Sequence, residues 1–133
     1  MLTYREYANK LRDLFKHKKG CSIADVALLK VGRHFRLGES KIIVGRNEAE
    51  NKILAAKKAQ GDYFFEVPDF GSPITLLQGP KTSKSIKMAA GLTAFYSDAK
   101  SDEVTVNFGK ESLSKSVLVH VPSQAEVDGV RVG

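Results

Sequence analysis

The strongest constraint on the fold is a series of short apolar segments, each bounded by turn-forming residues. Residues 31–37 alternate apolar and basic side chains with a break at Gly32, residues 38–40 form a turn, and residues 41–44 return as an apolar run. This pattern predicts a β-hairpin. Further strand segments are predicted at residues 63–67, 74–77, 104–108 and 117–121, with a short last strand at 130–132. Strands that come in hairpins favour an antiparallel sheet.

Helical segments separate these strand pairs. The first is predicted over Thr3–Lys19, where Thr3 and Glu6 form a capping box. Its apolar stripe, expected to pack on the domain, comprises Tyr4, Tyr7, Ala8, Leu11, Leu14 and Phe15, with Arg5, Lys10, Arg12 and Asp13 on the other side. A short helix follows Ser22, another starts at Asn47, and a long one after residue 80 contains Gly91, where another element is expected to approach closely. The predicted fold is α+β: a single domain whose mostly antiparallel sheet, built of hairpins, packs against two longer helices and is preceded by an N-terminal helix.

Charge is unevenly distributed along the 133 residues. The formal net charge is +6, and residues 1–61 hold 14 basic against 6 acidic residues, whereas residues 62–133 hold 7 against 9. A positive surplus confined to one half favours a polyanionic partner such as nucleic acid, with a merely solvated basic face as the alternative. Lysines of the second half, such as Lys110 and Lys115, are expected to contribute little to such binding.

Several other classes of protein are disfavoured. The apolar runs are too short for a transmembrane helix, no signal-peptide pattern opens the chain, and the single Cys21 fits a reducing cytoplasm. The three histidines lack metal-ligand spacing, no glycine-rich phosphate loop is present, and no nucleophile has a general base beside it. We therefore expect a binding module without a catalytic residue, metal or cofactor, and an independent small enzyme is the weakest alternative.

Two groups of basic residues in the first half are candidates for binding phosphates. Lys16, Lys18 and Lys19 end the first helix, where they either complement its dipole or form a phosphate-binding patch. In the first hairpin, Arg33 and Arg36 flank His34 and Phe35, an arrangement of guanidinium groups and rings that suits phosphates and unstacked bases. Phe35 is expected in the core and His34 at the surface.

A third candidate group lies at the start of the helix that follows the hairpin. Arg46 and Asn47 precede this helix, whose free backbone N–H groups favour an anion. Asn47 either caps the helix or contacts the ligand, and capping is the favoured interpretation. Capping does not require the guanidinium of Arg46, so a role in binding is favoured for this residue.

Five segments in the right order resemble the NFACT-R domain family. Residues 42–47, followed by Glu50 and Asn51, resemble its strand–Gly-Arg-Asn–helix entry. Residues 62–65 look like its Asp-x-Trp-Phe strand, residues 71–72 like its Gly-Ser turn, residues 89–97 like its Ala-rich helix ending in Tyr-Ser, and residues 104–106 like the next strand. The resemblance covers residues 31–132. The sequence departs from the family pattern at Lys52, Phe64, Glu66 and Pro73.

The resemblance implies an RNA-binding domain and adds Asn51 to the candidate binding residues. The stretch Leu29–Leu37 resembles the form of the family that follows PP-loop ATPases of the tRNA thiouridylase type. It implies a division into residues 1–22, a helical tether from a catalytic domain, and residues 23–133, the RNA-binding domain. The expected function is a non-catalytic tRNA-binding part of a sulfur-transfer enzyme, with a PP-loop ATPase domain as partner in cis or trans and no DNA or membrane partner. The alternative is a protein-interaction module that docks on a catalytic subunit or the ribosome.

Overall fold

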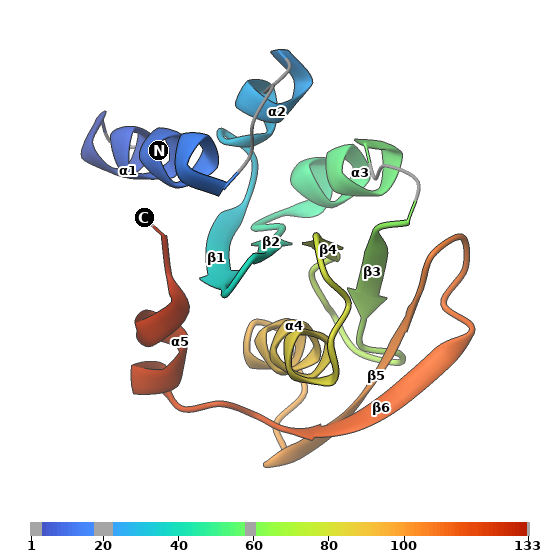
Figure 1. Cartoon of the computed structure of the whole chain (residues 1–133). Coiled ribbons are helices and arrows are strands. Elements are labelled where there is room, and N and C mark those ends of the chain that lie inside the picture. The colour runs from blue at the N-terminus through green and yellow to red at the C-terminus, as the bar shows by residue number, and fades with distance from the viewer. Residues whose placement is uncertain (1–3, 18–22, 58–60, 133) are drawn as a thin grey trace.

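The computed structural model describes residues 4–17, 23–57 and 61–132, and its centre is a six-stranded sheet. The strand order is β1-β2-β4-β3-β5-β6, and every neighbouring pair is antiparallel (Figure 1). The strands are β1 (Arg33–Leu37), β2 (Ser40–Val44), β3 (Tyr63–Glu66), β4 (Thr75–Gln78), β5 (Glu103–Gly109) and β6 (Lys115–His120). The predicted first hairpin is confirmed as β1 and β2, with Phe35 opposite Ile42.

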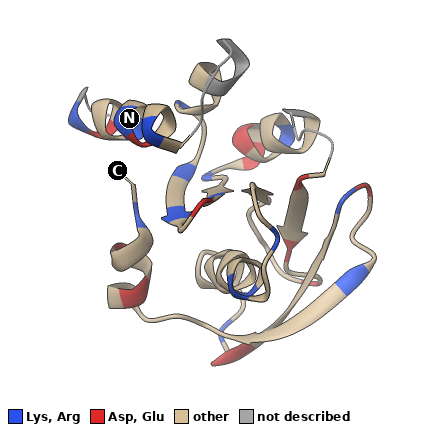
Figure 2. Cartoon of the chain, in the orientation of Figure 1, with Lys and Arg blue, Asp and Glu red and all other residues tan. Residues whose placement is uncertain are grey.

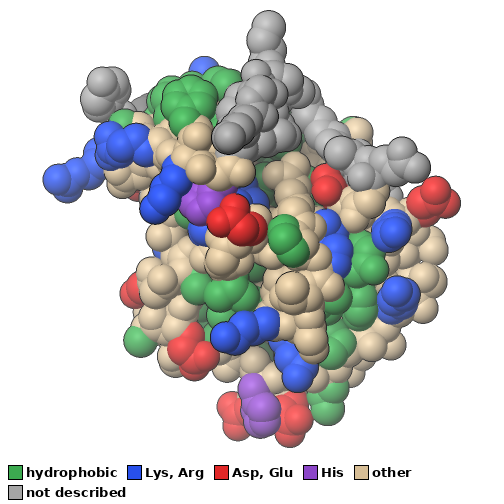
Figure 3. Space-filling model, viewed as in Figure 1, with side chains coloured by type: hydrophobic (Ala, Val, Ile, Leu, Met, Phe, Trp, Pro, Cys, Tyr) green, Lys and Arg blue, Asp and Glu red, His purple; other side chains and the backbone are tan. Residues whose placement is uncertain are grey.

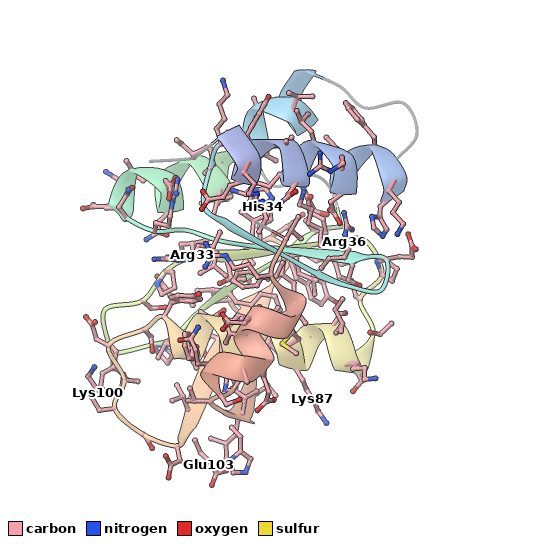
Figure 4. All side chains as sticks on the ribbon, turned by 90° about the vertical axis from the view of Figure 1, so that its left-hand side faces the viewer. Arg33, His34, Arg36, Lys87, Lys100 and Glu103 are labelled. Carbon is pink, nitrogen blue, oxygen red and sulfur yellow. The ribbon has the colours of Figure 1, made fainter. Side chains whose placement is uncertain are left out.

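Helices cover both faces of this sheet. In the described part of the chain they are α1 (Tyr4–His17), α2 (Ile23–Leu28), α3 (Glu48–Lys57), α4 (Ser83–Phe95) and α5 (Gln124–Val130). The first three lie on one face and α4 lies on the other, as the two views in Figures 1 and 4 show. The predicted α+β domain with a leading helix is therefore confirmed. None of the described helices has the length and apolar character that a membrane crossing requires.

Two apolar clusters hold the three layers together. The larger one lies between the sheet and α4, and the smaller one joins α2 and α3 to the opposite face through Leu28, Ile43, Leu54 and Leu76. In the larger cluster, Phe65 stacks on Phe108 with ring centroids 5.3 Å apart. A Cβ atom on Gly91 would lie 3.3 Å from Cδ of Pro122. The predicted close approach to the long helix is thus confirmed.

The N-terminal helix buries part of the predicted stripe, with Leu14 5 % exposed, but two of its residues differ from the prediction. Phe15 is 62 % exposed, whereas Lys10, expected on the outer side, is 2 % exposed. Its Nζ donates hydrogen bonds to the carbonyl oxygens of Leu29 and Gly32, each at 3.2 Å, and burial lowers the pKa of Lys10 to about 8. The prediction was wrong for these two residues because α1 docks through polar contacts, which apolar periodicity does not detect.

The end of the chain also differs from the prediction. Residues 124–130 form the helix α5, which Ser123 and Glu126 start with a capping box, so the strand predicted at 130–132 is reduced to an isolated bridge at Arg131. This signal was present in the sequence, since Glu lies three residues after Ser. After α5, the backbone N–H of Val132 donates to the carbonyl of His34 at 2.9 Å, and Arg131 forms an isolated antiparallel bridge with Phe35. The last described residues therefore pair with the edge strand β1.

Candidate nucleic-acid interface

One end of the sheet carries a depression that brings four of the predicted residues together. It has a volume of about 300 Å³ and lies where β1 begins, β2 ends and α4 ends. We call it the Arg33 hollow, and its polar and aromatic lining side chains are Arg33, Arg46, Asn47, Glu48, Asn51, Ser72, Tyr96 and Asp98. Three segments that resemble the NFACT-R family, residues 42–51, 71–72 and 89–97, thus meet at one place.

Arg33 is held against an aromatic ring. Its guanidinium carbon lies 4.3 Å from the centroid of the Tyr96 ring, which in turn contacts Phe35 with centroids 6.3 Å apart. In the described part of the chain, no carboxylate lies within ion-pair distance of Arg33. Burial lowers the pKa of Arg33 below its usual range, and the positive charges of Arg131 and Arg46 act in the same direction. An anion placed here would offset this unfavourable electrostatics.

Arg46 is fixed by Glu50. Its Nη2 and Nε donate to the two carboxylate oxygens of Glu50 at 2.7 and 2.9 Å, and the backbone N–H groups of Gly32 and Arg46 donate to the same carboxylate at 2.9 and 3.0 Å. The hydrogen bonds from the Arg46 side chain, above all, lower the pKa of Glu50 to about 2. The pair therefore ties the start of β1 to the turn after β2 and fixes the direction of the guanidinium.

The two asparagines complete this turn through backbone hydrogen bonds. Oδ1 of Asn47 accepts the backbone N–H of Glu50 at 2.9 Å, so the predicted helix cap is confirmed. Oδ1 of Asn51 accepts the N–H of Ile74 at 2.9 Å, which joins α3 to the loop before β4. A Cβ on Gly45 would lie 2.1 Å from this oxygen, so the Gly-Arg-Asn turn requires glycine at its first position.

His34 is not part of the hollow, and the prediction that it lies at the surface was wrong. The side chain is 0 % exposed, and its Nε2 lies 3.0 and 2.9 Å from the carbonyl oxygens of Leu28 and Val31. Two carbonyl acceptors require a proton on Nε2. Burial lowers the pKa of His34 well below its usual range, which keeps the ring neutral. The buried imidazole therefore has a structural role and presents no surface to RNA.

Arg36 also points away from the hollow, because side chains alternate along β1. Arg33 faces the α4 side, whereas His34 and Arg36 face α1 (Figure 4). Nε and Nη2 of Arg36 donate to the Asp13 carboxylate, with a shortest distance of 2.6 Å, and the Arg36 side chain is 14 % exposed. Its guanidinium group is engaged in docking α1, so the structure does not bring Arg36, a predicted binding residue, together with Arg33.

Lys16, the described lysine of the predicted basic run, lies apart from these residues. Lys16 is exposed on α1, in the helix layer on the opposite face from α4, and Lys18 and Lys19 lie outside the described residues.

Tyr96, which lines the hollow, was not among the residues predicted to bind. The available signal was its position at the end of the Ala-rich helix, but only the folded structure places its ring under Arg33. Among the described residues, no group of three or more His, Cys, Asp or Glu side chains could hold a metal ion.

The hollow thus combines two arginines and an aromatic ring with two carboxylates, Glu48 and Asp98, at the end of an antiparallel sheet. The chain belongs to the family described as the NFACT protein RNA binding domain, whose model matches residues 32–128. No curated protein sequence matches it significantly. A solved structure with the same fold is the C-terminal part of the fibronectin/fibrinogen-binding protein from Streptococcus suis, with a TM-score of 0.70 and 16 % identity. The match covers 98 % of this chain and 62 % of the other, so this chain spans less than two thirds of that structure.

Proposed function

We propose that the chain binds RNA through the Arg33 hollow and that this RNA is tRNA. The observation that carries the proposal is the Arg33 side chain, stacked on Tyr96 at 4.3 Å and without a described carboxylate in ion-pair distance. A guanidinium in this position offers its N–H donors to a phosphate, while the aromatic ring keeps the side chain in place. Arg46 sits beside it as a second positive charge at the start of α3.

The wider context is part of the same proposal. The family assignment supports an RNA-binding domain, and the resemblance of residues 29–37 supports the form that follows PP-loop ATPases. In this proposal the chain is a cytoplasmic, non-catalytic part of a tRNA sulfur-transfer enzyme, which presents tRNA to a catalytic domain in cis or in trans. The alternative, a protein-interaction module, would bind no RNA even at low salt.

The test is a titration of labelled tRNA at several salt concentrations. Each neutralised phosphate contributes a slope of roughly 0.7 in log affinity against log salt for single-stranded RNA, so Arg33→Ala should lower the slope by about this amount. Lys87→Ala is the matched control, because it removes one positive charge from an exposed position on α4 (Figure 4). Equal effects of both variants would show diffuse attraction without a site. Tyr96→Leu should weaken binding more than Tyr96→Phe, which keeps the ring.

Two further experiments test the identity of the ligand and of the partner protein. A tRNA should bind more tightly than an unrelated RNA hairpin or a DNA duplex of similar length at the same salt concentration. A stoichiometric complex with a PP-loop ATPase, together with tRNA thiolation that needs both proteins, would support the sulfur-transfer context. Equal affinity for the three nucleic acids would contradict the assignment to tRNA.

A further inference from the structure

The opposite end of the sheet carries a second gathering of positive charge. Lys81, in the coil before α4, and Lys115, at the start of β6, place their Nζ atoms 5.8 and 5.5 Å from the ring centroid of Tyr63. Lys110, just after β5, and Lys115 line a cavity of about 450 Å³ together with Tyr63 and one carboxylate, that of Glu111. We call Tyr63, Lys81, Lys110 and Lys115 the Tyr63 cluster. The sequence analysis expected the lysines of this half to matter little.

The figures show how the fold assembles this cluster. In Figure 2, blue segments at the turn between β5 and β6, on β6 and in the coil that enters α4 lie around the start of β3. On the face drawn in Figure 3, several blue side chains surround hydrophobic surface on the right-hand side of the molecule. Residues that are separated by up to 52 positions in the sequence are thus brought to one end of the sheet.

Two lysines of the cluster have no close carboxylate among the described residues. In the described part of the chain, neither Lys81 nor Lys115 has a carboxylate within 4.0 Å. Lys81 donates instead to the carbonyl oxygen of Gly79. Burial lowers the pKa of Lys81; the charge of Asp62 opposes this shift, and the smaller effect of Lys110 adds to it. Like charges held together in this way favour the approach of an anion.

The start of α4 adds to the positive potential. This helix has 13 residues, begins after the cap Thr82 and has no acidic residue in its first turn. Lys81 precedes the cap and Lys84 lies in the first turn. Cations at a helix N-terminus oppose the helix dipole, which is unfavourable. A bound anion offsets both the dipole and the repulsion among the lysines.

We propose that the Tyr63 cluster is a second phosphate-binding site, which holds the backbone of the same RNA that occupies the Arg33 hollow. The proposal rests on RNA binding at that hollow. The two sites lie at opposite ends of the strands, on the order of 17 Å apart along a five-residue strand such as β2 at ~3.4 Å per residue, and the displacement across the sheet from β1 to β3 adds to this separation. The component along the strand alone corresponds to about five phosphates of one strand at their spacing along a duplex. A polymer can bridge the two sites, whereas a free phosphate or nucleotide can occupy only one.

The experiment compares two double variants in the full chain. Lys81→Ala/Lys115→Ala should lower the slope of log affinity for labelled tRNA against log salt by the contribution of two phosphate contacts, roughly 1.4 for single-stranded RNA. Lys87→Ala/Lys100→Ala removes the same charge from exposed positions on and just after α4 and should leave the slope nearly unchanged. The single variant Lys115→Glu, at an exposed strand position, repeats the test without truncation of the side chain. Melting temperatures establish that every variant is folded.

Oligonucleotide length provides a second readout. Native protein should lose affinity steeply when single-stranded RNA is shortened from about ten nucleotides to three, because a three-residue RNA cannot reach both sites. Lys81→Ala/Lys115→Ala should show a much weaker dependence on length. An unchanged slope and length dependence in this variant, alongside a loss in Arg33→Ala, would overturn the second site alone. Failure of the native chain to bind any RNA would overturn both proposals.

Discussion

The Glu50 carboxylate is the strongest single electrostatic contact near the hollow, and its removal is expected to destabilise the fold. The side chain is 11 % exposed and accepts hydrogen bonds from Arg46 and from the backbone of Gly32. A pKa lowered from 4.5 to about 2 is equivalent to about 3 kcal/mol, at ~1.4 kcal/mol per pKa unit. The Arg46 side chain is 30 % exposed, so solvent screens the pair, and we expect Glu50→Gln to cost about 1–2 kcal/mol at neutral pH.

The pH dependence separates this electrostatic contribution from simple loss of packing. Because the folded-state pKa of Glu50 lies below the unfolded one, its stabilisation is fully present above pH 4.5 and is lost as the pH falls towards 2. Urea denaturation of the native chain and of Glu50→Gln should therefore converge across this range. A difference in unfolding free energy that stays constant from pH 7 to pH 2.5 would refute the reasoning. The variant should also bind RNA more weakly, since Arg46 loses the contact that orients it.

Three other substitutions test the remaining contacts by urea denaturation. Asp13→Asn should lower the free energy of unfolding by about 1–2 kcal/mol, because it breaks the partly buried ion pair with Arg36 that docks α1. An unchanged free energy of unfolding would mean that this pair does not hold the helix. The difference in free energy of unfolding between the native chain and Lys10→Met should shift in favour of the native chain as the pH rises from about 8 to 10.5. In this range the folded lysine loses its proton while the unfolded lysine keeps it. A difference that stays flat or falls would contradict this. Gly45→Ala should lower the free energy of unfolding by about 1–3 kcal/mol, because the new Cβ would lie 2.1 Å from Oδ1 of Asn51. A variant as stable as the native chain would show that the turn relaxes freely.

Local sequence signals predicted the elements that depend on local chemistry. Asn47 with Glu50 located the start of α3, and the alternation around residues 31–44 located the first hairpin. Both signals concern neighbours in the chain, so no tertiary information is needed. The Arg33 hollow was also partly predictable, because Gly45, Arg46 and Asn47 form a contiguous turn that determines its own geometry.

The sequence could not predict in the same way which side chains of a strand or helix are buried and which are exposed. Whether His34 is exposed depends on whether other elements cover that face of β1: its ring meets the carbonyl oxygen of Leu28 in α2, and α1 docks on the same face through Asp13 and Arg36. Lys10 is buried because two carbonyl groups beyond α2 accept its hydrogen bonds, a partnership that no periodicity records. The pairing of Arg33 with Tyr96 likewise joins residues 63 positions apart. Such contacts exist only once the layers are assembled.

The pairing of residues 131–132 with β1 has a consequence for the order in which the protein matures during synthesis. β1 is translated well before the groups that close its outer side, the Val132 N–H and the Arg131 bridge. A nascent chain therefore carries Arg33 for some time on a strand that is still open on one side. The edge strand can be completed only after residues 131–132 have been synthesised, so the surface around Arg33 reaches its final form after the rest of the sheet.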